Sequence, residues 1–523
     1  MMNQPRAQIL WADDEIDLLK AHQLYLREKG YEVTGVTNGP DAVEEIRNKH
    51  YDLVLLDEMM PGQDGLETLT QIKETAPGLP VIMITKNEEE SLMEEAIGSK
   101  ISDYLTKPVN PSQILLACKK ALEETKISGE QVSKSYINEF NRISQLLMIG
   151  PDSDEWIDLH FRLSQWEVEF DDHPDLGLNQ TLADQKKECN VEFGKYIEKH
   201  YSHWLNEEVD KRPDLSIDLV PQYVKPLLEQ HQKVVFVVVD CMRLDQWLTI
   251  ESMLYPYFRI RKDYYYSIMP TATPYSRNAI FSGLYPSDLP EYYPEIWQQA
   301  EDDDMSMNRH EHELLNRQLE RLNVSLDGGI KYIKVLDAEE GRTVERNIKS
   351  MTDIPLIALV INFVDILAHR RSESEFLQEM VPDEAGYRTI VRAWFEHSWL
   401  FQVLKQLSDS DYTVILTTDH GSIRVQNPAK VKADREASTN LRYKYGRNLN
   451  ANPKEAVFIA NPEDYKLPGR GVNTTYLLAK EDHYFVYPTE YNKYRNKFYN
   501  TFQHGGISLE EVILPVVTLQ PNR

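Results

Sequence analysis

Short apolar runs alternate with helix-like segments over the first 120 residues. The runs are QILWA, YEVTGV, DLVLLD, PVIMIT and DYLTK. Between them lie polar segments such as EIDLLKAHQLYLREKG, whose apolar positions recur three or four residues apart. Strands that alternate with amphipathic helices predict a doubly wound parallel sheet. We therefore expect a first α/β domain over residues 1–122.

The strand-like runs disappear between residues 123 and 215. Apolar residues recur here at helical spacing over 132–147, 156–170 and 193–204. Helices with one apolar face pack against each other in bundles. The pattern predicts a three-helix bundle connector. No basic recognition helix is visible in it, so we expect no DNA-binding domain. His160 has no carboxylates at ligand spacing and is expected to be an ordinary core or surface residue.

Residues 216–523 return to strands. The runs KVVFVVVD, LIALVINFVD and YTVIL are almost entirely apolar. Such runs are typical of strands buried on both faces of a parallel sheet. The chain is therefore predicted to be an α/β multidomain protein whose third domain contains a second sheet.

Composition narrows the class of protein. The chain has 41% hydrophobic and 27% charged residues, which is ordinary for globular domains. Its net charge of −27 argues against extensive contact with a nucleic-acid backbone. No apolar run approaches the length of a membrane span, and the three cysteines contain no CxxC pair. We expect a cytoplasmic protein with reduced thiols.

Polar residues cluster at the predicted strand ends of the first domain. Asp13 and Asp14 follow the first run, Asp57 ends the third, Thr85 the fourth and Lys107 the fifth. Ligands of doubly wound sheets bind at this edge. Three carboxylates there would repel one another without a cation, and Mg²⁺ suits oxygen ligands. A hydroxyl and an ammonium group nearby would suit a phosphoryl group.

This order of residues resembles the receiver domain of two-component response regulators, which have a CheY-like fold. The resemblance implies that Asp57 accepts a phosphoryl group from a sensor histidine kinase. It implies a magnesium site and a switch that responds to phosphorylation. The magnesium site would comprise Asp13, Asp14, Asp57 and Met59, and the switch Thr85, Tyr104 and Lys107.

A second polar cluster is predicted in the third domain. Its three apolar runs lead to Asp240, Asp365 and the pair Asp419–His420. Gly421 would permit a turn that brings this pair together. His369 lies one helical turn after Asp365, and His504 precedes two glycines beside another strand. Six such residues are too many for one tetrahedral ion and fit two. Mixed Asp and His ligands favour Zn²⁺.

Two threonines are candidate nucleophiles. Thr271 and Thr273 lie in MPTATPYSRNAIF, just before a helix-like run. A helix N-terminus favours an anionic group, and a metal can activate a hydroxyl for attack on phosphorus. Either threonine fits these requirements.

These residues resemble the alkaline phosphatase superfamily, and its PglZ-type branch most closely. The resemblance implies an alkaline-phosphatase-like α/β fold. It assigns Asp365, His369 and His504 to one zinc ion and Asp240, Asp419 and His420 to the other. It selects Thr273 as nucleophile and zinc ligand, with Thr271 as the alternative. The sequence PYS after Thr273 departs from the Phe-Pro-Asn of related nucleotide phosphodiesterases.

The order of receiver, helical connector and PglZ domain resembles response regulators associated with the type IX secretion system. That resemblance implies a sensor kinase, a sigma factor as a further partner, and a homodimer formed on phosphorylation.

A basic stretch follows the Asp–His pair. Residues 424–447 carry seven Lys or Arg and two acids in an otherwise acidic chain. Basic side chains would hold substrate phosphates, and Tyr443 or Tyr445 would stack on a base. The alternative is a solvated mobile loop. The predicted substrate-binding residues are Lys430, Lys432, Arg435 and Arg442.

Two functions from different classes are compatible with these patterns. One is a phosphorylation-controlled, zinc-dependent phosphodiesterase that acts on cyclic or linear oligonucleotides and regulates type IX secretion. The other is a non-catalytic signalling scaffold that binds a sigma factor and has a structural zinc site. An open metal position with a threonine beside it favours the enzyme, and a phosphomonoesterase is a third alternative.

Overall fold

The fold was analysed in a computed structural model of the chain. It describes residues 7–76, 78–86, 101–296, 308–351, 353–371, 374–434, 438–469, 471, 473–489 and 491–522. The chain divides into two compact units. The first comprises residues 1–141 and 169–178, and the second 142–168 and 179–523.

The first unit contains a five-stranded parallel sheet, as predicted. The strand order is β2-β1-β3-β4-β5. The strands are β1 (Ala7–Ala12), β2 (Tyr31–Val36), β3 (Leu53–Asp57), β4 (Val81–Thr85) and β5 (Asp103–Thr106). They are accompanied by α1 (Lys20–Glu28), α2 (Gly39–Asn48), α3 (Gly65–Thr75) and the start of α5 (Pro111–Ile149). The expected CheY-like arrangement is confirmed.

Alternation along β1 explains why both faces of this sheet are covered. Ile9 and Trp11 pack in one buried cluster, together with residues of α1 and α5. Leu10 and Ala12 pack in another, against α2 and α3. Successive side chains of a strand point to opposite faces, so a strand with apolar side chains on both faces requires helices on both sides.

Three long helices occupy the middle of the chain, as the helical periodicity predicts. They are α5, α6 (Ser153–Asp172) and α7 (Asn179–Trp204). Helix α5 has 39 residues and runs without interruption past residue 122. The predicted end of the receiver domain therefore lies within a helix and not in a loop. In the second unit, Trp156 of α6 packs edge-on against Phe193 of α7, with ring centroids 5.2 Å apart.

The second unit is built on a six-stranded mixed sheet. Its strand order is β7-β18-β10-β6-β9-β8. Four strands are parallel: β6 (Lys233–Val239), β8 (Ile330–Val335), β9 (Leu356–Ile361) and β10 (Tyr412–Thr417). Two are antiparallel to their neighbours, β7 (Phe258–Tyr266) and β18 (Ile513–Pro521). The parallel sheet expected from the apolar runs is thus extended by β18, which runs antiparallel to β10, and by β7, which pairs antiparallel with β18.

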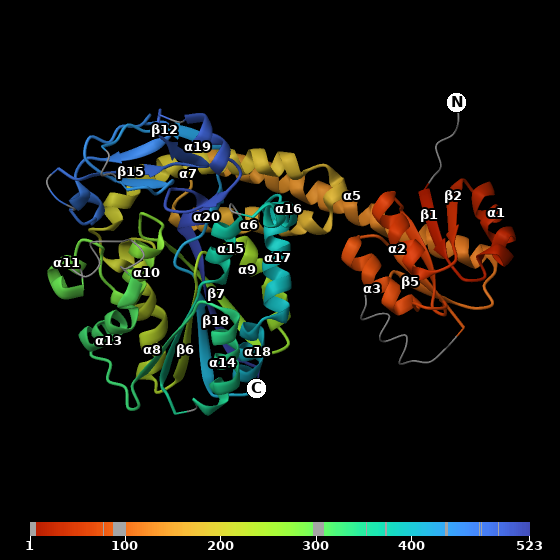
Figure 1. The fold of residues 1–523 in the computed structure, drawn as a ribbon, viewed down its shortest axis with the longest axis horizontal. Coiled ribbons are helices and arrows are strands. Elements are labelled where there is room, and N and C mark those ends of the chain that lie inside the picture. The colour runs from red at the N-terminus through yellow and green to blue at the C-terminus, as the bar shows by residue number, and fades with distance from the viewer. Residues whose placement is uncertain are drawn as a thin grey trace. The chain divides into compact units, whose positions relative to one another are not determined.

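Helices cover both faces of the mixed sheet (Figure 1). One buried cluster contains residues of α9 (Leu244–Ile250), α14 (Ala338–Asn347), α17 (Glu384–His397) and α18 (Trp399–Ser408). The other contains residues of α8 (Lys225–Glu229), α10 (Thr273–Ser282), α11 (Leu289–Tyr292) and α13 (Glu311–Arg321). Alternate residues of β6, such as Val235 and Phe236, belong to opposite clusters.

Smaller elements lie between β10 and β18 in the sequence. β11 (Ile423–Arg424) pairs with β17 (Phe502–Gln503), and β12 (Asn427–Lys430) with β16 (His483–Val486). β13 (Tyr443–Gly446), β15 (Thr475–Ala479) and β14 (Ala456–Ile459) form a three-stranded sheet. Four short helices complete the unit: α15 (Phe363–Arg371), α16 (Glu375–Met380), α19 (Tyr491–Phe498) and α20 (Leu509–Val512). Among the residues that the structure describes, no helix combines the length and apolar character that a membrane span requires.

Candidate active site and phosphorylation site

The three acids predicted at the receiver strand ends lie together. Asp13, Asp14 and Asp57 each offer a carboxylate oxygen within 4.8 Å of the others. Lys107, after β5, places Nζ 3.0 Å from Asp13 Oδ2 and 2.9 Å from Asp57 Oδ1. Burial raises the pKa of Asp57, although the hydrogen bond from Lys107 acts in the opposite direction. A carboxylate cluster with two buried members and one neighbouring ammonium group suits a divalent cation.

The other predicted receiver residues lie on or just after strands β3, β4 and β5. Thr85 ends β4, and its hydroxyl donates a hydrogen bond to the carboxylate of Glu58. Tyr104 lies on β5 and is 40% exposed. Met59 follows Asp57 by two residues and has an exposed side chain. Because Mg²⁺ prefers oxygen ligands, only the main-chain carbonyl of Met59 suits the predicted magnesium site.

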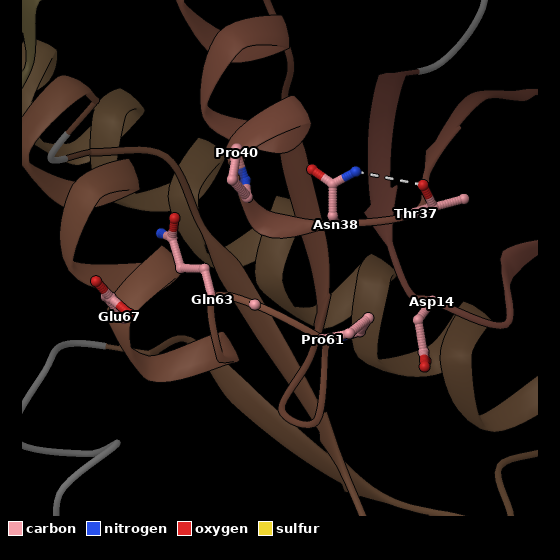
Figure 2. Close-up of a pocket in the computed structure, with 8 residues that line it drawn as sticks. Asp14, Thr37, Asn38, Pro40, Pro61, Gln63 and Glu67 are labelled. Carbon is pink, nitrogen blue, oxygen red and sulfur yellow. Dashed lines mark hydrogen bonds between the residues drawn. The ribbon is translucent and has the colours of Figure 1, made fainter.

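An open pocket of about 730 Å³ lies beside this cluster (Figure 2). Asp14 and Thr37 line it on one side, and Gln63 and Glu67 on the other. Asn38 also lines it and caps α2 by accepting a hydrogen bond from the backbone N–H of Asp41. The exposed Asp14 therefore makes the acid cluster reachable from solvent.

The six predicted ligands of the third domain form two groups. We call Asp365, His369 and His504 the first metal group, and Asp240, Asp419 and His420 the second. Within each group, the candidate ligand atoms lie within 4.8 Å of one another. The two groups adjoin, because the rings of His420 and His504 stack with centroids 4.2 Å apart.

The first metal group is built differently from the sequence prediction. Asp365 was expected at a strand end, but β9 stops at Ile361 and Asp365 lies in the first turn of α15. Its Oδ1 lies 3.3 Å from Nε2 of His369, one turn further along the same helix. His504 follows β17, and its Nε2 lies 3.4 Å from Nε2 of His369.

The second metal group depends on a close backbone approach. Gly421 follows His420 and does not adopt the positive φ of a glycine turn. A Cβ added there would lie 1.9 Å from the backbone oxygen of Glu510. The predicted turn at Gly421 is thus corrected: glycine is needed because another chain segment passes against it.

The electrostatics of these groups favour a bound cation. Asp419 is fully buried, and among the described residues its Oδ2 accepts no hydrogen bond. Burial raises the pKa of Asp240 to about 7, with Arg277 opposing and Asp419 adding to the shift. Burial also lowers the pKa of His504 well below its usual value, and His420 lowers it further. Buried carboxylates beside imidazoles are a donor set that Zn²⁺ uses.

The two candidate threonines have different surroundings. Thr273 is the first residue of α10, and its Oγ1 lies 3.0 Å from Nε2 of His420. Thr271 is fully buried. Its hydroxyl donates to the backbone oxygen of Gly506 at 2.8 Å and accepts from the N–H of Gly505 at 3.2 Å. Thr273 therefore faces the second metal group, while Thr271 braces the loop that carries His504.

The predicted substrate-binding residues are only partly suited to that role. Lys430 and Lys432 are exposed. Arg435 lies outside the described residues. Arg442 is fully buried, and Glu511 accepts from its Nε at 3.1 Å and from its Nη2 at 2.5 Å. The prediction for Arg442 is wrong, because its charge is already neutralised inside the protein.

The aromatic part of that prediction also changes. Tyr443 is 2% exposed, and its ring packs edge-on against Tyr275 with centroids 5.7 Å apart. It is therefore a core residue and not a platform for a base. Tyr445 is half-buried on β13.

The sequence analysis missed two residues that hydrogen-bond to the candidate ligand Asp240 through the oxygen that is turned away from the second metal group. Arg277 and Asn362 donate to Oδ2 of Asp240 at 2.7 Å and 3.0 Å. Arg277 lies four residues after Thr273, on the same face of α10. This spacing could have identified Arg277 from the sequence, because it places a charged side chain one helical turn from the candidate nucleophile.

Three family models match the chain. A response regulator receiver domain matches residues 9–119, a PorX response regulator linker domain 126–205, and a BREX system PglZ alkaline phosphatase-like domain 219–519. Fold, acid cluster and matches together define a response regulator with an alkaline phosphatase-like effector domain. The chain belongs to the PglZ family, and its receiver, linker and PglZ domains have the architecture of PorX-type response regulators.

Curated relatives match through the N-terminal part. The transcriptional regulatory protein ZraR of Klebsiella oxytoca is 35% identical over 142 residues, which are 27% of this chain and 32% of that protein. ResD of Bacillus subtilis is 36% identical over 114 residues, 22% of this chain and 47% of that protein. The chain thus spans about a third to a half of these relatives.

Solved receiver domains also match. One from Methanospirillum hungatei is 28% identical and covers 23% of this chain and 97% of its own, with a TM-score of 0.23. One from Clostridium thermocellum is 27% identical and covers 23% and 98%, with a TM-score of 0.22.

Proposed function

We propose that the PglZ domain is a zinc-dependent phosphodiesterase whose activity is controlled by phosphorylation of Asp57. The observation that carries the proposal is the position of Thr273. Its hydroxyl lies 3.0 Å from His420 Nε2 and 3.5 Å from Asp240 Oδ1, at the N-terminus of α10. A hydroxyl beside the metal ligands is needed for nucleophilic catalysis, whereas a structural zinc site does not require one.

The first and second metal groups would each hold one zinc ion, with Thr273 as an additional ligand in the second. Bound zinc would lower the pKa of the Thr273 hydroxyl and stabilise negative charge on the phosphoryl oxygens. His420 is oriented for this purpose, because its Nδ1 lies 3.1 Å from the backbone oxygen of Gly421. Donation of the Nδ1 proton to that oxygen leaves the Nε2 lone pair facing Thr273.

The chain's own residues support a two-step reaction. Thr273 Oγ1 loses its proton and attacks phosphorus, and the bond from phosphorus to the leaving alcohol oxygen breaks. The leaving oxygen takes up the proton, and the phosphorus, which still carries the second alcohol, stays bonded to Thr273 Oγ1 as a covalent phosphodiester. Water then attacks the same phosphorus, the bond from phosphorus to Thr273 Oγ1 breaks, Thr273 regains a proton and the phosphate monoester is released. The N-terminus of α10 favours the anionic phosphoryl group throughout.

The substrate class we propose is a cyclic or linear oligonucleotide or a similar phosphodiester. Exposed Lys430 and Lys432 supply positive charge in a chain with a net charge of −27. Phosphates away from the reacting centre would bind to such residues.

Control would come from the receiver. Asp13, Asp14 and Asp57, with the carbonyl of Met59, would hold Mg²⁺ while a sensor histidine kinase phosphorylates Asp57. Thr85 and Lys107 would bind the phosphoryl oxygens, Tyr104 would respond on the output face, and the chain would form a homodimer. We also propose a role in type IX secretion, with a sigma factor as a further partner, because the order of receiver, linker and PglZ domains resembles response regulators associated with that system.

The test is an assay of the purified full-length chain with metal analysis of the same sample. Substrates should include a chromogenic phosphodiester, the matching monoester and short cyclic and linear oligonucleotides. Faster hydrolysis of diesters with zinc bound is the expected result. Hydrolysis of the monoester alone would favour a phosphatase. Bound zinc without turnover of any ester would favour the sigma-factor scaffold.

A further inference from the structure

The two carboxylate oxygens of Asp240 face different partners. Oδ2 accepts hydrogen bonds from Arg277 Nη1 at 2.7 Å and from Asn362 Nδ2 at 3.0 Å. Oδ1 lies 3.5 Å from both His420 Nε2 and Thr273 Oγ1. One oxygen is thus held by protein donors, and the other is turned toward the second metal group.

Arg277 is itself fixed by a buried carboxylate. It is 2% exposed, and its Nε donates to Oε1 of Glu311 at 2.5 Å. Glu311 is 1% exposed and begins α13. Its Oε2 accepts from the hydroxyl of Tyr332 and lies 3.3 Å from Nζ of Lys334. Burial raises the pKa of Glu311, but Arg277 and Lys334 more than compensate, so this pKa lies below its usual value.

The same glutamate is connected to the candidate nucleophile. Asn308 donates through Nδ2 to Oε1 of Glu311 at 3.0 Å and to the backbone oxygen of Thr273 at 3.2 Å. Glu311 is therefore linked to Asp240 through the side chain of Arg277, and to the backbone of Thr273 through the side chain of Asn308. Arg277 lies on α10, Glu311 begins α13 and Asn308 lies three residues before it, and α10 and α13 pack in one buried cluster.

We propose that Arg277, held in place by Glu311, is a positioning residue that fixes Asp240 as a ligand of the second metal group. The proposal rests on the metal centre proposed above. Arg277 occupies Oδ2, so Asp240 would offer the metal a single oxygen in a defined direction. Arg277 also lies near a second carboxylate of this group, since its Nη1 is 3.9 Å from Oδ2 of Asp419. The ion pair with Glu311 holds the guanidinium on the side of Asp240 and helps to neutralise its buried charge.

Residues that orient a metal ligand from behind change metal affinity when they are replaced. Loss of such a partner typically lowers affinity by about 10-fold to 100-fold. Arg277→Gln and Glu311→Gln should therefore weaken zinc binding at one of the two groups by about that factor. The first metal group should keep wild-type affinity, since neither residue contacts Asp365, His369 or His504 in the hydrogen bonds and ion pairs of the described residues.

The experiment is a chelator competition on the full-length chain, which reports two zinc affinities per protein. Co²⁺ substitution gives a second readout, because its visible absorption depends on ligand geometry. The matched control is Arg212→Gln, since Arg212 forms another buried ion pair, with Nη1 2.6 Å from Asp218 Oδ2, and donates hydrogen bonds to Asp218 and Pro213 and not to a candidate metal ligand. The control should lose stability and keep both zinc affinities.

Three results are decisive. Selective weakening of one zinc ion in Arg277→Gln or Glu311→Gln, with an altered Co²⁺ spectrum, supports the proposal. Wild-type affinities in both variants overturn it. A loss of both zinc ions that is equally large in the two variants and in the control Arg212→Gln overturns it as well. If Arg277→Gln does not fold, the isosteric Glu311→Gln carries the test. A wild-type chain that binds two zinc ions but hydrolyses no diester would contradict the proposed function and leave the comparison of affinities valid.

Discussion

The imidazole rings of His420 and His504 stack with centroids 4.2 Å apart and an angle of 15° between their planes. His420 follows β10, and His504 follows β17. Through this stack, each metal group has one histidine in direct contact with the other group. Replacing either ring should consequently change metal affinity at both positions.

The first prediction concerns metal content. The wild-type chain should retain about two zinc equivalents, because its six ligands form two groups. His504→Ala should remove the zinc ion of the first group and weaken the second, since it deletes a ligand and its stacking partner. Metal analysis after gel filtration measures this. His483→Ala, on β16, is the control and should keep both ions. Two equivalents in His504→Ala would refute the ligand assignment.

The second prediction separates the two threonines. Thr273→Val removes the hydroxyl near His420 and should lower diesterase turnover by about 10³-fold or more, while the six Asp and His ligands remain. Thr271→Val loses hydrogen bonds to Gly505 and Gly506 and should instead lower stability by about 1–3 kcal/mol. Steady-state kinetics and thermal unfolding measure the two effects. A wild-type rate in Thr273→Val would end the proposed mechanism.

The third prediction concerns the receiver. Beryllofluoride, which mimics an acyl phosphate, should draw Thr85 away from Glu58 and toward Asp57, and should shift the chain toward a dimer. Sedimentation with and without the mimic measures this shift. Asp57→Ala removes the acceptor and should not respond. Identical sedimentation of the wild-type chain under both conditions would rule out control of dimerisation by phosphorylation.

The fourth prediction concerns acid stability. His160 of α6 is 2% exposed, and both ring nitrogens lack hydrogen-bond partners among the residues described. Burial lowers its pKa to about 4 from the usual 6.5. Between these values the unfolded chain binds a proton that the folded chain does not, so stability falls as the pH decreases through this window. The loss should reach about 2 kcal/mol at pH 5.

Calorimetry of the second unit at pH 7 and pH 5 measures this loss. His160→Gln removes the titrating group and should show a smaller decrease in unfolding temperature between the two pH values. His203→Gln changes an exposed histidine of α7 and should behave like the wild-type chain. An unchanged decrease in His160→Gln would show that other groups cause the acid loss.

Sequence patterns predicted elements more reliably than the contacts between them. Burial on both faces was visible in KVVFVVVD, because apolar periodicity is a property of a single strand. The environment of Arg442 was not visible, because its partner Glu511 lies 69 residues away. Gly421 shows the same limit. Its neighbour Glu510 comes from α20, so a glycine that was expected to permit a turn is required by packing.

The clustering of the six candidate ligands was predictable, because strand ends and helical spacing place them locally. Asp365 was assigned correctly to a position near His369, although its element is a helix and not a strand. Arg277 and Glu311 were missed because each resembles an ordinary charged residue of a helix. Only their burial, at 2% and 1% exposure, distinguishes them.

The strand order of the mixed sheet has a consequence for synthesis. β18 is the last of its six strands in the sequence, yet it lies between β7 and β10. On the ribosome, every other strand of this sheet emerges first, and the gap between β7 and β10 stays open until residues 513–521 arrive. β10, which precedes Asp419 and His420, therefore lacks its β18 neighbour until these last residues have been synthesised.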